Sequence, residues 1–293
     1  MTKTHKTIAQ ILNPPPVHFV GDGFRVHNFF PGRGEMPLNR MSPFFLIDYA
    51  AKHYFTPTDE PRGVGVHPHR GFETVTIAYH GKIAHHDSAG NSGIIEQGGV
   101  QWMTAGSGIL HKEYHEKEWG KTGGIMQMVQ IWVNLPAKFK MSSPKYQAIN
   151  NEQLGKIQLQ NNGGEIEVIA GNYQGIQGPA STFTPIEMYN LKIKASAKLS
   201  ISLPENYNTG LLILEGIIKI NRTEATENQY VLFENTGTEI EIEALNDAVV
   251  LVLSGEPIDE PIYPYGPFLM NNKQEIIQAY QDLENGKFGY LEN

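Results

Sequence analysis

The chain contains no cysteine, so neither a disulfide bond nor a thiolate that could bind metal or attack a substrate is available to it. It also lacks a long apolar run: the stretch 248–253 is far shorter than the roughly 20 residues needed to cross a membrane. Residues 1–8 have no apolar core of the kind that marks a signal peptide. A soluble cytoplasmic protein without membrane association is therefore the simplest prediction.

Basic blocks are missing as well. The formal net charge is −8, with 23 Lys and Arg against 31 Asp and Glu. Binding to a nucleic-acid backbone requires a positive patch, so direct nucleic-acid binding is not expected. Histidine is absent from more than half of the chain, because all eleven lie between His5 and His115. Any chemistry that depends on imidazole is therefore expected in the first half.

The residues that are present are typical of a globular β protein with two domains. A chain of 293 residues is long enough for two hydrophobic cores. Thirty glycines and 18 prolines are spread among short runs rich in Val and Ile, which indicates many turns between short strands. We predict one domain over 1–136, a second over 137–257 and a tail over 258–293.

A weak internal repeat predicts that the two domains are barrels of similar topology. Around Gly81 and again around Gly216, an apolar strand reaches a glycine turn and another apolar strand leaves it. Counting back from Gly216 as far as the first copy's histidines lie from Gly81 reaches Ser202 and Pro204. Because neither residue replaces imidazole as a metal ligand, the second copy is predicted to be structural.

Two residue pairs in the first half have the spacing of metal ligands on β-strands. One is His67 with His69, and the other is His111 with Glu113. Alternate side chains of a strand point to the same face, so each pair presents both groups in one direction. Two such strands inside a barrel would combine three imidazoles with one carboxylate, which suits a divalent first-row transition metal. The alternative from these residues alone is four polar side chains on an exposed strand face.

The end of the chain has the pattern of one amphipathic helix. Asn271 or Asn272 is the expected N-cap, and Gly286 the expected end. The predicted apolar face consists of Ile276, Ile277, Tyr280 and Leu283.

Several segments of the chain resemble those of the pirin family. The most specific are 67–76 (HPHRGFETVT) and 101–111 (QWMTAGSGILH), and 131–135, 42–48 and 266–271 also match. The resemblance therefore extends over nearly the whole chain. It implies an all-β bicupin, in which two antiparallel β-barrels of the jelly-roll type lie face to face and only the N-terminal barrel binds metal. That agrees with the absence of histidine after residue 115.

Carried over from the family, the metal ligands fall on His67, His69, His111 and Glu113. The resemblance implies Fe(II) in octahedral coordination, which would leave two positions for water, dioxygen or substrate. Mn, Ni, Cu or Zn would suit the same donors, so the sequence does not choose among these metals.

A rival ligand is Glu73, which would share the face of His67 and His69 on an unbroken strand. Many cupins use a glutamate at this spacing, whereas pirins use the glutamate of the second motif, here Glu113. A bulge at Gly71 would turn Glu73 away, and we therefore favour Glu113.

Other residues have two interpretations. Only one of the adjacent His85 and His86 can face the barrel interior, and His85 matches a histidine common in the family. His115 shares the parity of Glu113 and could support it, although a surface position is the expectation. Two interpretations also exist for four aromatic residues, which could line a pocket for a flat aromatic ligand or could simply belong to the core: Phe44, Phe45, Phe72 and Trp102.

The resemblance also implies an activity. Several pirins are similar to quercetin 2,3-dioxygenases, which use dioxygen to open the heterocycle of a flavonol and release carbon monoxide. The expected partners are then a small aromatic substrate and O2, with Glu113 as general base for the 3-hydroxyl proton. We predict such a dioxygenase, acting on a flavonol or a related enediol. The alternatives are a non-catalytic iron-binding regulator that acts through protein partners, and a metal that only stabilises the barrel.

Overall fold

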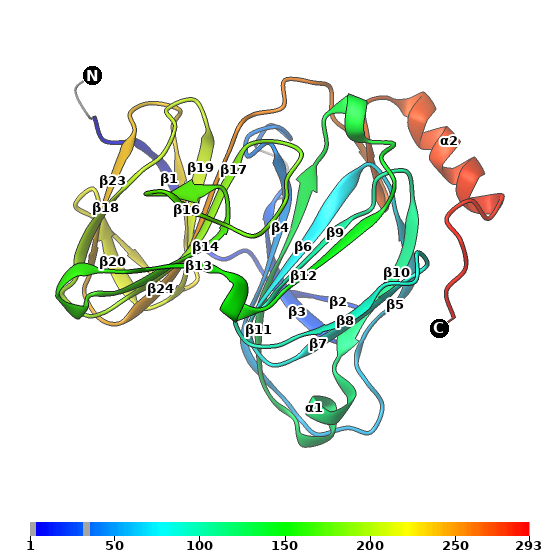
Figure 1. Ribbon diagram of the computed structural model, residues 1–293, viewed down its shortest axis with the longest axis horizontal. Coiled ribbons are helices and arrows are strands. Elements are labelled where there is room, and N and C mark those ends of the chain that lie inside the picture. The colour runs from blue at the N-terminus through cyan, green and yellow to red at the C-terminus, as the bar shows by residue number, and fades with distance from the viewer. Residues whose placement is uncertain (1–3, 32–35, 293) are drawn as a thin grey trace. The chain divides into compact units, whose positions relative to one another are not determined.

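A computed structural model describes residues 4–31 and 36–292 and divides the chain into two compact units, each an antiparallel β-barrel (Figure 1). The first barrel, which carries the histidine motifs, comprises Pro16–Asn39, Phe44–Glu152 and Ile258–Asn293. The second barrel comprises Met1–Pro15, Arg40–Pro43 and Gln153–Pro257. Two antiparallel barrels with a short C-terminal helix are the fold that the sequence predicted.

The first barrel contains a seven-stranded sheet of order β12-β9-β6-β11-β4-β3-β2 and a four-stranded sheet of order β5-β10-β7-β8. A small β25-β26 ribbon, the short helix α1, a 3-10 turn and the C-terminal helix α2 complete it. The bounds are β2 His18–Val20, β3 Phe24–Phe30, β4 Phe44–Phe55, β5 Gly63–His69, β6 Phe72–His80, β7 Ile83–Asp87, β8 Ser92–Ile95, β9 Val100–Thr104, β10 Ile109–His115, α1 Lys117–Thr122, β11 Gly124–Asn134, η1 Ala137–Phe139, β12 Lys145–Ile149, β25 Tyr263–Tyr265, β26 Phe268–Met270 and α2 Lys273–Glu284.

The second barrel has a seven-stranded sheet of order β1-β22-β19-β24-β17-β14-β13, a four-stranded sheet of order β18-β23-β20-β21 and a small β15-β16 ribbon. The bounds are β1 Ile8–Leu12, β13 Gly155–Gln158, η3 Gln160–Asn162, β14 Gly164–Ala170, β15 Asn172–Tyr173, β16 Ile176–Gln177, β17 Ile186–Ile193, β18 Lys198–Ser202, β19 Asn208–Glu215, β20 Ile217–Ile220, β21 Thr223–Thr226, β22 Tyr230–Phe233, β23 Glu239–Ala244 and β24 Ala248–Gly255. The 3-10 turn η2 covers Asn151–Gln153, where the chain passes from one barrel to the other.

The two barrels share one strand plan. Strand β6 turns at Gly81 into β7 just as β19 turns at Gly216 into β20, and the φ angles of the two glycines are 87° and 86°. Their four-stranded sheets match strand for strand, with β5, β10, β7 and β8 in the places of β18, β23, β20 and β21. The internal repeat thus corresponds to a repeat of architecture.

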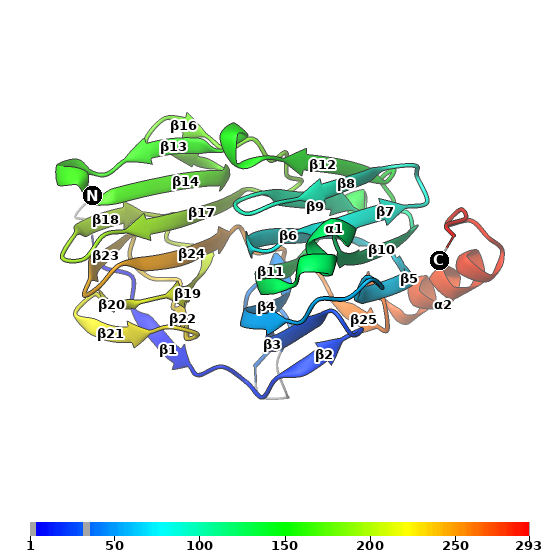
Figure 2. The same cartoon turned by 90° about the horizontal axis from the view of Figure 1, so that it is seen from below.

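The division of the chain differs from the predicted domains 1–136, 137–257 and 258–293. Strand β1 pairs with β22, so the first residues join the second barrel, as Figure 2 shows. Strand β12 pairs with β9 and extends the first barrel beyond residue 136. The tail belongs to the first barrel, where α2 lies beside β5 and β10 (Figure 2). These pairings are non-local, so local sequence patterns could not reveal them.

Helix α2 has the predicted cap. The Asn272 side chain accepts a hydrogen bond from the backbone N–H of Glu275. Of the predicted apolar face, Ile276 is buried and Tyr280 and Leu283 pack against the same hydrophobic cluster, whereas Ile277 is exposed and the buried Ala279 was not predicted. Among the described residues, no helix is long and apolar enough to span a membrane.

Candidate metal centre

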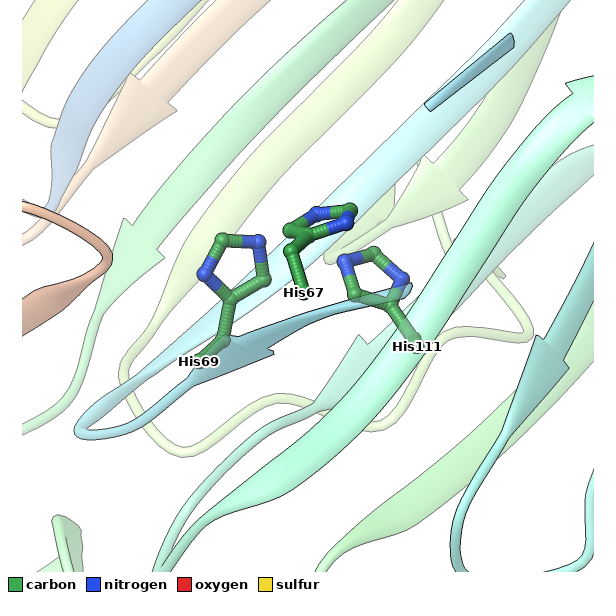
Figure 3. Close-up of side chains that lie close together, drawn as sticks. All are labelled: His67, His69 and His111. Carbon is green, nitrogen blue, oxygen red and sulfur yellow. The ribbon is translucent and has the colours of Figure 1, made fainter. Parts of the chain in front are cut away.

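Strands β5 and β10 carry the two predicted residue pairs, and three of these four residues, His67, His69 and His111, form one group of possible ligands. The strands are antiparallel neighbours, and His111 lies directly opposite His67. Burial alternates along β10, with His111 and Glu113 on the buried side, as the spacing predicted. The rings of His67, His69 and His111 converge (Figure 3), and their possible ligand atoms lie within 4.8 Å of one another.

The hydrogen bonds of these histidines leave nitrogen lone pairs available. His67 Nδ1 lies 2.8 Å from the Gly65 carbonyl oxygen, and His69 Nδ1 lies 3.1 Å from that of Pro267. A carbonyl only accepts, so Nδ1 is the donor in both pairs, and in the neutral form of either ring Nε2 carries a lone pair. Both ring nitrogens of His111 are buried, and neither has a hydrogen-bond partner among the residues that the structure describes. Since buried polar groups without a partner are unfavourable, the ring nitrogens of His111 fit a role in binding a metal ion.

The electrostatics agree with a cation site. Burial, together with the neighbouring His67, lowers the pKa of His69 to about 3. Burial and the adjacent His69 and His67 lower the pKa of His111 well below its usual value. These two imidazoles are therefore neutral at physiological pH, which is the form that binds a metal ion.

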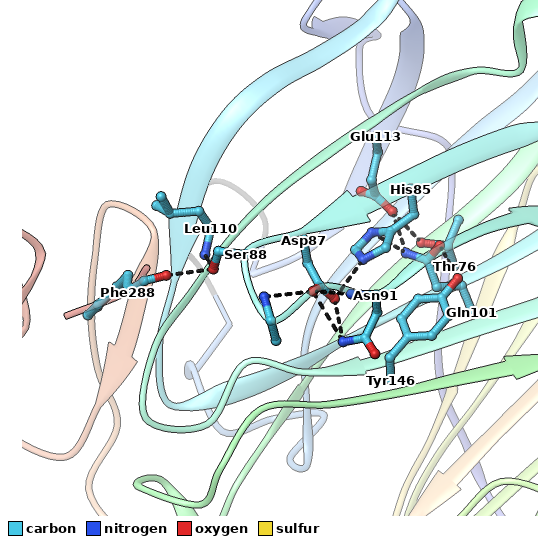
Figure 4. A network of polar contacts seen from close by, with 11 residues as sticks. Thr76, His85, Asp87, Ser88, Asn91, Gln101, Leu110, Glu113, Tyr146 and Phe288 are labelled. Atoms are coloured by element: carbon cyan, nitrogen blue, oxygen red, sulfur yellow. Dashed lines mark hydrogen bonds and ion pairs between the residues drawn. The ribbon is translucent and has the colours of Figure 1, made fainter. Parts of the chain in front are cut away.

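Glu113 adjoins the three histidines through His111. Its carboxylate forms a second group with His85 and His111, whose possible ligand atoms also lie within 4.8 Å of one another. Thr76 Oγ1 and Gln101 Nε2 donate to Oε1 at 3.1 and 3.0 Å (Figure 4), and Gln130 Nε2 donates to Oε2 at 2.6 Å. Donors from three strands of the opposite sheet thus hold the carboxylate in one orientation.

His85 has both ring nitrogens occupied. Hydrogen bonds from His85 and Asn91 hold the pKa of Asp87 below its usual range, although burial opposes this, so Asp87 is ionised. His85 Nε2 lies 3.1 Å from Asp87 Oδ2 and is therefore the donor in that pair (Figure 4). Its Nδ1 accepts from Gln101 Nε2, whose other hydrogen goes to Glu113. His85 thus orients the amide that orients Glu113.

The rival Glu73 lies outside both groups of possible ligands that the described residues form. Strand β5 ends at His69, and the chain turns at Gly71 with φ of 89° before β6 begins, so the unbroken strand that Glu73 would need does not exist. Within β6, Glu73 has the opposite parity to Thr76, which faces Glu113. Its Oε1 accepts a hydrogen bond from Thr104 at 2.7 Å.

Two further expectations concern histidines. His85 is fully buried, whereas His86 is half-buried and stacks on Tyr114, so the inward member of the pair is His85. The expected surface position of His115 is wrong. Its side chain is buried, Nε2 donates to the Gly23 carbonyl at 2.8 Å, and its ring packs edge-on against aromatic rings. It supports the barrel core away from Glu113.

Of the four aromatic residues considered from the sequence, Phe72 reaches the candidate ligands. Its ring lies 5.0 Å from that of His69 and stacks on Trp132 at 4.1 Å between centroids. Trp132 also lies 5.1 Å from His69. Phe44 and Phe45 are buried, and Trp102 points away from the site because its neighbour Gln101 points toward it. Phe72 and Trp132 therefore form an aromatic wall beside His69.

Sequence reasoning missed Thr76, Gln101, Gln130 and Trp132. Gln101 is a buried polar residue in β9 and Gln130 a half-buried one in β11, and such polar residues in mainly apolar strands were the available signal, although β11 also contains Gln127. The carbonyl of Pro267 gave no signal, because a backbone group has no side-chain signature.

The second barrel carries aliphatic residues at the equivalent positions. Strand order and register match His67, His69 and His111 with Ile201, Leu203 and Ile240. Glu113, His85, Thr76, Gln101 and Gln130 correspond in the same way to Ile242, Ile220, Leu211, Val231 and Val252. All of these aliphatic residues belong to one buried cluster. Counting back along the sequence from Gly216 gave Ser202 and Pro204, each one residue after the structurally equivalent Ile201 and Leu203. The reason is that the second barrel has one more residue than the first between this strand and its glycine turn.

Comparisons with known proteins agree with this geometry. The family model Pirin matches residues 23–133, and that of the pirin C-terminal cupin domain matches residues 188–289. A Pseudomonas aeruginosa protein that is provisionally named quercetin 2,3-dioxygenase is 46% identical over 97% of this chain and 98% of its own length. The crystal structure of quercetin 2,3-dioxygenase from Acinetobacter baumannii is 43% identical, covers 99% of this chain and 100% of that one, and superposes with a TM-score of 0.93. The Escherichia coli pirin YhhW, solved with nickel(II), shares the fold at 20% identity and a TM-score of 0.65, over 85% of this chain and 100% of that one.

Proposed function

The chain belongs to the pirin family, and we propose that it is a metal-dependent dioxygenase of the quercetin 2,3-dioxygenase type. The observation that carries this proposal is the convergence of three imidazoles. Nδ1 of His67 and of His69 donates to a backbone carbonyl, which leaves Nε2 as the possible ligand atom, and in His111 neither ring nitrogen has a hydrogen-bond partner among the described residues. The names of the Pseudomonas and Acinetobacter relatives support it.

The proposed ligands are His67, His69, His111 and Glu113. Three neutral imidazoles and one carboxylate suit Fe(II), our first candidate, and also Mn, Ni, Cu or Zn. When bound, such an ion supplies Lewis acidity and a path for electrons between an electron-rich substrate and dioxygen. The site offers at most four protein donors, so an octahedral ion would keep positions open.

Glu113 is the proposed general base. Gln101, Gln130 and Thr76 fix its carboxylate, and the proton that it would take is that of the flavonol 3-hydroxyl. Because the donors come from a rigid sheet, the carboxylate needs no reorganisation before the proton moves.

In the aromatic wall, the half-buried Trp132 would contact the flat rings of the substrate, and the fully buried ring of Phe72 would support it from behind. Stacking of aromatic groups at this separation is favourable, and both rings contact His69, so a substrate held there lies next to the proposed ligands. The overall reaction joins flavonol and O2, opens the heterocycle to an ester and releases CO.

The test begins with protein that is loaded with Fe(II) under anaerobic conditions. After admission of oxygen, quercetin should cause O2 uptake with release of one CO per flavonol. His69→Ala should abolish both uptake and tight metal binding. Leu203→Ala, at the matching position of the second barrel, is the control for lost packing and should retain turnover in its folded fraction.

Tight metal binding without oxygen uptake for flavonols or related enediols would contradict the dioxygenase. It would favour a regulatory or purely structural metal. Absence of metal binding in the wild-type protein would overturn the whole proposal.

A further inference from the structure

The C-terminal tail, defined here as residues 263–292, lies against the strands that carry the candidate ligands. It starts with the β25-β26 ribbon and continues through α2 to the last described residue. On the β5 side, the Pro267 carbonyl accepts the hydrogen bond from His69 Nδ1 at 3.1 Å. This is a contact between the tail and a proposed metal ligand, across 198 residues of sequence.

Arg70, the residue after His69, anchors the tail at the same place. Its buried guanidinium donates from Nη1 to Asp282 Oδ2 at 2.9 Å and lies 4.7 Å from the centre of the Phe288 ring. Asp282 is buried too and also accepts from Lys287 Nζ at 2.7 Å. Hydrogen bonds from Lys287 and then Arg70 hold the pKa of Asp282 far below its usual range, so the ion pair is present at neutral pH.

The tail holds the β10 side as well. Ser88 Oγ donates to the Phe288 carbonyl at 2.5 Å and accepts from the backbone N–H of Leu110 at 3.0 Å, a bridge visible in Figure 4. Lys112 Nζ donates to the Glu292 carbonyl at 2.8 Å. Leu110 and Lys112 are the two neighbours of His111, so the tail contacts the chain on both sides of that ligand.

Two glycines allow this close approach. A side chain at Gly71 would collide with the carbonyl of Leu269, and one at Gly108 would collide with the ring of Phe288. Both have positive φ, 89° and 130°, and they lie in the turns next to β5 and β10. The buried Lys140 joins the same elements, because its Nζ donates to the carbonyls of both Gly71 and Leu269 at 2.8 Å.

We propose that the tail is a positioning element of the metal centre, with Asp282 as the residue that fastens it. The tail keeps Nδ1 of His69 protonated and hydrogen-bonded, which directs Nε2 to the metal, and it fixes the backbone on both sides of His111. The inference rests on the proposed metal centre. Outer hydrogen bonds of this kind orient ligand imidazoles, and their loss typically lowers metal affinity about 10–100-fold.

The test uses the full-length chain loaded with nickel(II), which does not oxidise in air, and measures the rate of nickel transfer to excess EDTA. Asp282→Ala should accelerate release about tenfold, and Asp282→Asn should do so less. The matched control is Glu284→Ala, which removes an exposed carboxylate from the same helix and should leave the rate unchanged. His69→Ala is the reference for a lost ligand.

A second measurement reports on positioning directly. In ¹⁵N-labelled protein, the resonance of the His69 Nδ1–H should be protected from exchange in the wild type and in Glu284→Ala, and it should broaden or vanish in Asp282→Ala. If Asp282→Ala does not fold, Ser88→Ala carries the same prediction. It removes only the bridge between Phe288 and Leu110 and should accelerate release about threefold, as expected for one hydrogen bond.

Two outcomes separate the two proposals. If His69→Ala releases nickel rapidly while folded Asp282→Ala and Ser88→Ala release it at the wild-type rate, the tail has no positioning role although the metal centre stands. If His69→Ala binds nickel as the wild type does, the metal centre itself is wrong.

Discussion

Where the first barrel carries His67, His69 and His111, the second carries Ile201, Leu203 and Ile240 on equivalent strands. Burial of each such aliphatic side chain contributes about 1.5–3 kcal/mol to folding. Imidazoles and a carboxylate at the same places give up that contribution and require hydrogen bonds or a metal instead. The arrangement of strands that the two barrels share therefore does not require the polar residues of the candidate metal centre. The first barrel supports its polar interior through Gln101, Gln130 and the C-terminal tail.

The largest effect is expected from exchanging one position between the barrels. His69→Leu should reduce metal affinity by more than about 100-fold, because it removes a proposed ligand rather than a group that orients one. The reverse change, Leu203→His, should destabilise the second barrel by roughly 2–4 kcal/mol, since it buries an imidazole without a partner. Isothermal titration with nickel(II) measures the metal affinity of His69→Leu, and urea unfolding measures the stability of Leu203→His. If His69→Leu bound nickel(II) as tightly as the wild type does, the proposed difference between the two barrels would be wrong.

Glu113→Gln should have the next largest effect. It removes the proposed base while keeping the volume of the side chain, so turnover should fall about 10²–10⁴-fold. Oxygen uptake with quercetin measures this at full metal occupancy, which metal analysis must establish for both proteins. The matched change in the second barrel, Ile242→Val, should leave turnover intact. Equal turnover in Glu113→Gln and wild type would remove Glu113 from the reaction.

Both barrels also bury a carboxylate outside the site, and their environments differ. Glu167 accepts a hydrogen bond from Lys192 Nζ, whereas burial raises the pKa of Glu73 from 4.5 to about 7. The folded state thus holds the Glu73 proton more tightly than the unfolded chain does. Stability contributed by this group is present below about pH 4.5 and is lost as the pH rises to about 7.

Glu73→Gln should consequently raise the free energy of unfolding above pH 7, by up to about 3 kcal/mol, and flatten its dependence on pH between 4.5 and 7. Glu167→Gln should instead lower stability, because Lys192 loses one of its two carboxylate partners and keeps only Glu165. Urea titrations at several pH values on the metal-free protein measure both. The nickel affinity of Glu73→Gln should equal that of the wild type. A lower affinity would make Glu73 a candidate ligand again.

Gln130→Val should have the smallest effect, because it copies Val252 and removes only one of the donors to Glu113. Metal affinity should fall about tenfold, at the lower end of the range for groups that orient a ligand. Stability of the metal-free protein should stay within about 1 kcal/mol, since a buried aliphatic side chain replaces the lost hydrogen bond. A loss as large as that of His69→Leu would mean that Gln130 has a more direct role.

The sequence predicted what depends on local pattern. The i, i+2 spacing put His111 and Glu113 on one face of β10, and the repeated glycine turn predicted two similar barrels. It could not predict the groups around the carboxylate, because Gln101 and Gln130 approach from other strands. The offset at Leu203 arose from a single extra loop residue, which a count along the chain cannot detect. Pro267 acts through its backbone, so its identity carries no information about the contact.

The pairing of β1 with β22 affects how the molecule can form during synthesis. The second barrel needs residues 8–12 together with residues 230–233, which are made much later. The first barrel in turn needs its C-terminal tail, which is made after residues 153–257 of the second barrel. Multidomain chains generally fold one domain after another as they emerge. Here β1 has no pairing partner until Tyr230–Phe233 have been made, so during synthesis the second barrel has an open sheet edge, a feature that favours aggregation.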